Sequence, residues 1–193
     1  MTTTWWWVRH GPTHQKTIVG WRDVPADLSD HIRIQKLNAF LPKDALLVSS
    51  DLQRASATAD AISDGRTRLP HDPALREFDF GRWDGLGFDK VARLDPTLSR
   101  AFWENPGDIA PPGGESWNAV AKRAAPAVEA INSRYAGRNI IAVAHIGIIM
   151  TQIQMASGTS PSHAISHKID NLSVTRLHLQ NGVWSVGAIN HIP

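Results

Sequence analysis

Residues 5–13 read Trp5-Trp6-Trp7-Val8-Arg9-His10-Gly11-Pro12-Thr13, a run of aromatic and β-branched residues that stops at a Gly-Pro turn. Such a run predicts a buried β-strand. Its last two residues are Arg9 and His10, a permanent cation beside a titratable imidazole. In open α/β sheets, ligands bind beyond the carboxyl ends of the strands. We therefore expect this strand to bring an anion-binding group and a nucleophile or base to a binding edge.

The rest of the chain alternates predicted strands and helices. Strands are expected at 45–48 and 139–144, with a short edge strand at 66–69. Helices are expected at 30–41, 52–62, 115–135 and after Gly147 as far as Met155 and Gly158. Residues 87–104 predict two short helices, and 172–179 with 183–189 predict an antiparallel hairpin across Asn181-Gly182. This order predicts an α/β fold, a three-layer α/β/α sandwich around a mostly parallel sheet, in a single domain spanning 1–193. A small helical and loop cap insertion is expected over roughly 80–114.

The amino-acid composition argues against several classes of binding partner and cross-link. The 193 residues include no cysteine and carry a formal net charge of +2, with no block of like charges. These features argue against disulfides, thiolate metal sites, nucleic acid and membrane partners. The apolar N-terminal run is too short for a signal sequence or a membrane span, so a soluble cytoplasmic protein is expected. His163 and His167 have the i, i+4 spacing of a metal pair, but this spacing is more commonly that of solvent-facing polar residues on a helix.

Two further segments bring polar side chains to the predicted binding edge. The strand at 139–144 ends in His145, and Ser49-Ser50-Asp51 predicts a helix start that places Arg54 in the first turn. A cation there opposes the helix dipole, and a bound anion would explain its presence. If the three strands are neighbours, two imidazoles and two guanidinium groups meet at one edge.

Such a group of side chains suits phosphoryl transfer. Arg9 and Arg54 are expected to hold a phosphate dianion, and one imidazole to attack the phosphorus. Glu77 is the best candidate to protonate the leaving alkoxide. Each residue taken alone has a simpler reading, because a single strand-end histidine is commonly structural and Arg54 could pair with Asp51 or Glu77. Their joint occurrence at matching positions favours the catalytic reading.

Five segments, in this order, resemble the histidine phosphatase superfamily, the phosphoglycerate-mutase-like proteins. They are Arg9-His10-Gly11-Pro12-Thr13; Ser49 to Ala55 with Thr58-Ala59; Leu75-Arg76-Glu77 through Gly85; Pro112-Gly113-Gly114-Glu115-Ser116; and Val143-Ala144-His145-Ile146-Gly147. The resemblance covers about Thr4 to Ile192. It implies a phosphorylated nucleophile at His10, a proton donor at Glu77, and a phosphate pocket of Arg9, Arg54 and His145. It further implies that Thr13 and the backbone N–H of Ile146 bind phosphoryl oxygens, with no metal or organic cofactor.

Several positions depart from the pattern of this superfamily and bear on the substrate. Ile146 replaces a small residue and would crowd the pocket, and Met150 replaces a residue that is basic in many relatives. His14 and Lys16 stand where acidic and asparagine residues are usual. Candidate contacts at the rim of the site are Trp21, Arg82 and Trp83.

The choice between phosphatase and mutase depends on the cap. Gly20-Trp21 with Asp23 resembles the mutases, but residues 85–113 lack their longer basic insertion. The run Leu75 to Gly85 resembles the phosphatase branch, which includes α-ribazole-phosphate phosphatase-like proteins. We therefore expect a metal-independent, acid-type histidine phosphatase that acts on a small phosphorylated metabolite. The alternatives are a phosphoglycerate-mutase-type phosphotransferase, a metallophosphatase, or a non-catalytic phosphate-binding module; homodimer formation stays open.

Overall fold

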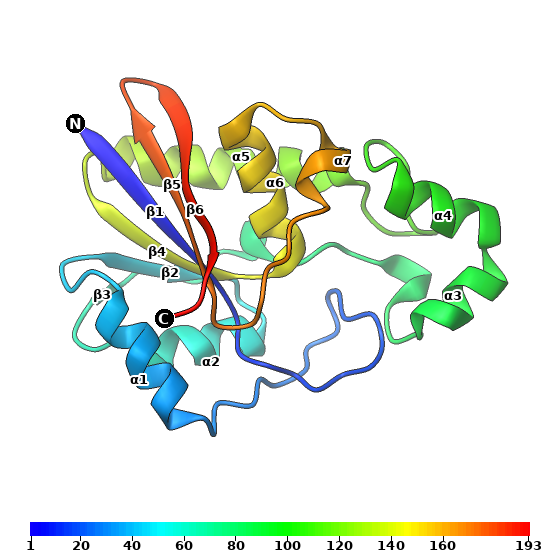
Figure 1. Cartoon of the computed structure of the whole chain (residues 1–193), viewed down its shortest axis with the longest axis horizontal. Helices are drawn as coiled ribbons and strands as arrows, with labels where there is room; N and C mark the ends of the chain where they lie inside the picture. The colour runs from blue at the N-terminus through cyan, green and yellow to red at the C-terminus, as the bar shows by residue number, and fades with distance from the viewer.

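The computed structural model describes all residues from Met1 to Pro193 and contains one six-stranded sheet (Figure 1). Its strands are β1 (Thr2–Arg9), β2 (Leu46–Ser49), β3 (Thr67–Arg68), β4 (Asn139–Ala144), β5 (Val174–Gln180) and β6 (Val183–His191). The spatial order is β3-β2-β4-β1-β5-β6. The first four of these are mutually parallel, and β5 and β6 run antiparallel as the predicted hairpin.

The helices follow the predicted order along the chain. They are α1 (His31–Phe40), α2 (Gln53–Ala61), α3 (Phe88–Leu94), α4 (Pro96–Glu104), α5 (Trp117–Arg134), α6 (Ile146–Ser157) and α7 (Pro161–Ala164), with 3₁₀ turns η1 (Pro73–Leu75) and η2 (Gly81–Trp83). None of them combines the length and the apolar character needed to cross a lipid bilayer.

Alternating side chains of the strands divide the core into two layers. Ile140 and Ala142 of β4 pack with α5 and α6, whereas Ile141 and Val143 of the same strand pack with α1 and α2. This alternation follows from the period of two in a strand. Both faces of the sheet are therefore covered by helices, and the predicted three-layer α/β/α fold is confirmed.

The tryptophans of β1 show why this strand lies in the middle of the protein. Trp5 and Trp7 point to the α5 side, are fully buried, and stack with their ring centroids 5.1 Å apart. The Trp5 indole donates a hydrogen bond of 2.8 Å to Asn132 of α5, so its polar atom is satisfied in the core. Two buried indoles on one face fix the register of β1, because a one-residue slip would exchange its two faces.

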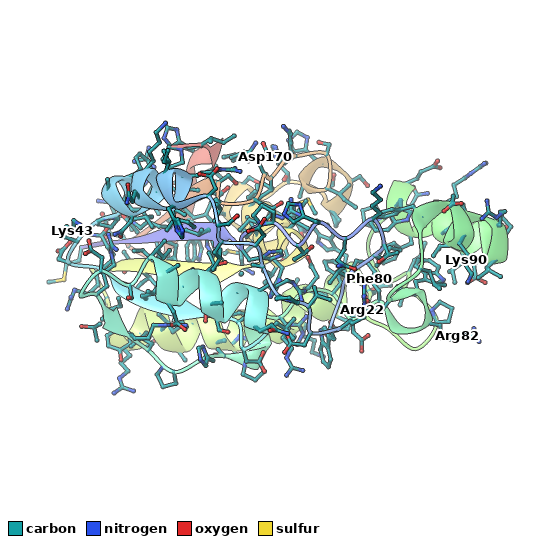
Figure 2. The ribbon with its side chains drawn as sticks, turned by 90° about the horizontal axis from the view of Figure 1, so that it is seen from below. Arg22, Lys43, Phe80, Arg82, Lys90 and Asp170 are labelled. Atoms are coloured by element: carbon teal, nitrogen blue, oxygen red, sulfur yellow. The ribbon has the colours of Figure 1, made fainter.

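Helices α3 and α4 lie beyond the end of the sheet, and Figures 1 and 2 show them apart from the sheet and its covering helices. The Trp83 indole donates to Asp95 at 2.8 Å and ties η2 to the junction of α3 and α4. Gly81 has φ +49°, and a Cβ atom there would collide with the backbone of Pro112 and Gly113. This close approach joins the two ends of the segment that the sequence marks as the cap.

The predicted start of α2 at Ser49-Ser50-Asp51 is wrong in its details. The helix begins at Gln53, and no side chain caps it. Ser49 instead contacts His71, and Asp51 forms an ion pair with Arg76. These polar side chains hold neighbouring loops, so their local preference for a helix start is overridden by tertiary contacts. Arg54 still falls in the first turn, as expected.

Candidate active site

The carboxyl ends of β1 and β4 place two histidines side by side. Arg9 of β1 lies opposite Ala144 of β4 in the sheet, and the next residue in each chain segment is a histidine. The rings of His10 and His145 are tilted by 57° with centroids 5.1 Å apart. The backbone N–H of His10 donates to the Ala144 carbonyl at 3.0 Å and extends the pairing past the strand end. The predicted meeting of these two imidazoles is therefore present in the structure.

The hydrogen bonds of His10 determine which ring nitrogen is available. Its Nδ1 lies 2.7 Å from the Gly11 carbonyl oxygen, which can only accept. Nδ1 must therefore carry the proton, and Nε2 keeps its lone pair in the neutral ring. The Asn171 amide donates to the carbonyls of His10 and Gly11, at 2.8 and 3.3 Å, and the Gly11 N–H donates to Thr58 at 2.9 Å. This loop is held rigidly enough to orient a nucleophile.

Two guanidinium groups are anchored by neutral carbonyl oxygens. Arg54 is 1% exposed and donates to Gly20 at 2.7 Å and to Arg22 at 3.1 Å, while Arg9 donates to Ile169 at 2.6 Å. The Nε of Arg9 is buried without a partner. Neither arginine forms an ion pair, so the alternative pairing of Arg54 with Asp51 is wrong. Burial of two cations without a paired anion favours binding of an anionic ligand between them.

Glu77 lies buried at the N-terminus of α6. One carboxylate oxygen accepts the Phe78 N–H at 2.9 Å, and both oxygens accept the Gly147 N–H, at 3.1 and 3.2 Å. Burial nevertheless raises the pKa of Glu77, because loss of water outweighs these hydrogen bonds and the attraction of Arg54 and Arg9. A Cβ at residue 147 would collide with Glu77 and Phe78, so only glycine permits this approach. A raised pKa suits a group that must donate a proton.

Both histidines are held in their neutral forms. Burial, followed by the nearby Arg54, lowers the pKa of His10 to about 3, with Arg9 contributing less and the Gly11 hydrogen bond opposing the change. Burial and Arg54 likewise lower the pKa of His145 well below its usual value. Both ring nitrogens of His145 are buried without a protein partner. They are free to hydrogen-bond a ligand bound beside His10.

The low pKa of His10 predicts acid-sensitive folding. The folded pKa of about 3 lies below the unfolded value of 6.5, so protons favour the unfolded chain between these limits. This contribution to stability is fully present above pH 6.5 and is lost as the pH falls towards 3. For His10 alone, the loss at pH 5 is about 2 kcal/mol of unfolding free energy.

Urea unfolding of the wild type and His10→Gln, at about pH 7.5 and about pH 5, measures this loss. The free energy of unfolding should fall less between the two pH values in His10→Gln than in the wild type. His31→Gln, at an exposed position of α1, is the matched control and should retain the wild-type pH dependence. Equal pH dependence in the wild type and His10→Gln would contradict the buried neutral state of His10.

Most of the predicted site residues share one cavity of about 440 Å³, but His145, which is fully buried beside His10, is not among its lining residues. Its lining includes Arg9, His10, Thr13, Arg54 and Glu77. Helix α6 contributes three further lining residues, Ile146, Gly147 and Met150. The first turn of α6 also presents backbone N–H groups that have no carbonyl partner within the helix, as anion sites commonly do.

Comparison with known proteins places the chain in a family. A profile of the histidine phosphatase superfamily (branch 1) matches residues 5–192. The chain belongs to this superfamily. It is 31% identical over 198 residues to phosphoglycerate mutase-like protein 4 of Arabidopsis thaliana, covering 96% of this chain and 85% of that protein. It is 36% identical over 158 residues to glucosyl-3-phosphoglycerate phosphatase of Mycolicibacterium vanbaalenii, covering 74% and 68% of the two chains.

One solved structure is similar over the whole fold. Bacillus stearothermophilus YhfR superposes with a TM-score of 0.90 at 28% identity and covers 99% of this chain and 98% of that one. The relatives are thus phosphatases and mutase-like proteins of the histidine phosphatase superfamily.

Three predicted rim residues lie outside the cavity lining of this superfamily member. Arg82 is exposed on η2, beside the cap helices (Figure 2). Trp83 is 1% exposed and packs in the core. The Trp21 indole donates to the Glu77 carbonyl at 2.8 Å, and the guanidinium of Arg76 lies over its ring at 4.9 Å. None of the three lines the cavity; Trp83 belongs to the core, and Trp21 supports the segment that carries Glu77.

Arg123 of α5 is a supporting residue that the sequence reasoning missed. Its guanidinium donates to the carbonyls of Ala74, Arg76 and Glu77 and pairs with Glu115 at 2.8 Å. These contacts hold the Glu77 segment against α5. The eight-residue spacing between Glu115 and Arg123 crosses a helix start and has no local signature, so nothing in the sequence marks this pair.

Other polar residues singled out from the sequence lie away from the site. His14 is exposed and contacts Asp27 at 2.8 Å, and Lys16 is exposed. His163 and His167 pack edge to face with ring centroids 5.4 Å apart. No group of three or more His, Asp or Glu side chains is arranged to hold a metal ion.

Proposed function

We propose that the protein hydrolyses phosphate monoesters of small metabolites through a phosphohistidine formed on His10. The observation that carries this proposal is the state of His10, whose Nδ1–H is held by the Gly11 carbonyl while Nε2 remains an unprotonated nucleophile. Arg9, Arg54 and His145 surround it with groups that bind a phosphate dianion. Glu77 lines the same cavity, and its raised pKa suits it to act as the general acid.

The reaction proceeds in two displacements at phosphorus. In the first, the His10 Nε2 lone pair forms a P–N bond while the P–O bond to the alcohol breaks, and Glu77 gives its proton to the leaving oxygen. In the second, water attacks the phosphohistidine, Glu77 accepts a proton from that water, and the P–N bond breaks to release phosphate and neutral His10. The guanidinium groups of Arg9 and Arg54 oppose the charge that develops on the phosphoryl oxygens.

The charges around the cavity favour hydrolysis over the mutase alternative. Arg9 and Arg54 are the only cationic side chains that line it. A phosphoglycerate mutase must also bind a carboxylate and a second phosphate, and burying those anions without a counter-charge is costly. The transferred phosphoryl group therefore passes to water.

Rapid mixing with ³²P-labelled substrate tests this function. We expect an acid-labile, base-stable phosphoenzyme that forms and decays at the rate of turnover, and activity that survives EDTA. With 3-phosphoglycerate as the substrate, release of inorganic phosphate should exceed formation of the 2-phospho isomer. Isomerisation with little release of phosphate would establish the mutase alternative, and loss of activity with EDTA would establish a metal-dependent reaction.

A further inference from the structure

The cavity continues past the phosphate-binding residues into a cluster of aromatic side chains. The members belong to the Glu77 segment and the two cap helices: Phe78, Phe80, Phe88, Phe102 and Trp103. Their rings contact one another, with centroids of Phe80 and Trp103 6.1 Å apart and those of Phe88 and Trp103 5.9 Å apart. We call these five residues the aromatic wall. The part of the substrate beyond the phosphate therefore faces hydrocarbon.

Each charged residue of the cavity lining already has a role in binding or transferring the phosphate. Apart from Arg9, Arg54 and Glu77, the cavity has no ionisable lining residue except the neutral His10. The other polar side chains, Thr13, Gln15 and Thr17, come from a single loop. A carboxylate or second phosphate on the leaving group would lose its water without gaining a partner. The lining thus selects against a charged leaving group.

One member of the aromatic wall is largely exposed to solvent. Phe88 on α3 is 58% exposed although it lines the cavity. Leu94 on the same helix is 60% exposed and does not line the cavity. A ligand seated against Phe88 and Trp103 would remove apolar surface from water, which is the main favourable term in binding a hydrocarbon group. Helix α6 adds Ile146 and Met150 to the same apolar lining.

We propose that the substrate is the phosphate ester of an uncharged alcohol with an aromatic or branched hydrocarbon skeleton, seated on the aromatic wall. This inference rests on the phosphatase activity proposed above. The alcohol packs against Phe88 and Trp103 while its phosphate lies between Arg9 and Arg54. Small polar esters place only their phosphate in the cavity and forgo the apolar contacts.

Three alkyl esters test the substrate class, because their alkoxide leaving groups are chemically alike. They are 3-phenylpropyl phosphate, glycerol 3-phosphate and 3-phosphoglycerate. We expect kcat/KM for the phenylpropyl ester to exceed that for 3-phosphoglycerate by about 100-fold. Equal values for the three esters would overturn the substrate class and leave the phosphatase activity standing.

Substitutions of two exposed residues on α3 test the aromatic wall itself. Phe88→Ala should reduce the ratio of kcat/KM for phenylpropyl phosphate over glycerol 3-phosphate by about tenfold, mainly through KM. Leu94→Ala is the matched control, because it removes a similar exposed apolar group outside the cavity, and should retain the wild-type ratio. Met150→Lys introduces a cation into the lining and should raise kcat/KM for 3-phosphoglycerate relative to the phenylpropyl ester. An unchanged ratio in Phe88→Ala would overturn the proposal.

Binding of a phosphonate separates this inference from the activity on which it rests. Calorimetry with 3-phenylpropylphosphonate, which cannot be hydrolysed, should give tighter binding than methylphosphonate in the wild type and a smaller difference in Phe88→Ala. If none of the three esters is hydrolysed while the phosphonate still binds in this way, the phosphatase proposal fails and the ligand class stands. If the two phosphonates bind equally well, the ligand class fails.

Discussion

His10→Ala is expected to lower kcat/KM for p-nitrophenyl phosphate by about 10⁴-fold, because it removes the atom that forms the covalent intermediate. The remaining Arg9, Arg54 and His145 still hold the phosphate, so binding of inorganic phosphate should persist. The trapped phosphoenzyme should disappear completely. Steady-state assays and acid-labile ³²P incorporation measure the two effects on the same preparation.

The matched control for this substitution is His163→Ala, at an exposed histidine of α7. It should retain the wild-type rate and the phosphoenzyme. Because His145 lies next to His10, the identity of the nucleophile also needs a direct assignment. Peptide mapping under alkaline conditions should place the phosphate on the peptide that contains His10. Phosphate found on the His145 peptide, or a labelled His10→Ala protein, would refute the assignment.

Glu77→Gln is expected to have an effect that depends on the leaving group. For an alkyl ester, kcat/KM should fall by about 10²- to 10⁴-fold, because the alkoxide leaves without a proton from an acid. For p-nitrophenyl phosphate, kcat/KM should fall much less, since nitrophenolate is a stable anion. Water attack on the phosphohistidine still lacks its base, so nitrophenol should appear in a burst and the phosphoenzyme should accumulate. Rapid-quench kinetics with both esters distinguish these steps.

The pH profile gives a second readout of Glu77. Burial raises its pKa, and the protonated carboxyl is the donor. Activity on an alkyl ester is therefore fully present at pH values below this raised pKa and is lost as the pH rises through it. The ratio of wild-type to Glu77→Gln kcat/KM should decline in the same direction, because ionisations of the substrate cancel. Equal losses with both esters and a pH-independent ratio would show that Glu77 only supports the structure.

Local sequence was sufficient to predict the sheet and its two histidine-bearing strand ends. The continuous apolar runs of β1 and β4 are a local property, and the period of two in a strand determines which of their side chains face each helical layer. Gly11-Pro12 follows the end of β1, and Ile146-Gly147 begins α6 after β4, so that His10 and His145 come directly after the two strands. Glycine at 147 is likewise readable in the sequence, although its reason, contact with Glu77, is not.

Tertiary structure alone decided what each polar side chain does. Ser49 and Asp51 have the sequence of a helix start, yet the neighbouring loop supplies His71 and Arg76 as their partners. Trp21 and Trp83 could not be separated from cavity residues by sequence, because packing and ligand contact use the same aromatic side chains. The residues that do face the cavity from the cap, Phe88 and Trp103, are brought there by the position of α3 and α4.

The sequence by itself thus determined the layers, the strand ends and the chemical groups available for phosphoryl transfer, because these depend on periodicity and residue type within short segments. The tertiary structure decided the ionisation of His10 and Glu77 and the apolar character of the cavity. Burial and the approach of Arg54 and Arg9 set the ionisation of these two side chains. The apolar character of the cavity depends on five aromatic rings from three segments meeting in space, which no local pattern encodes.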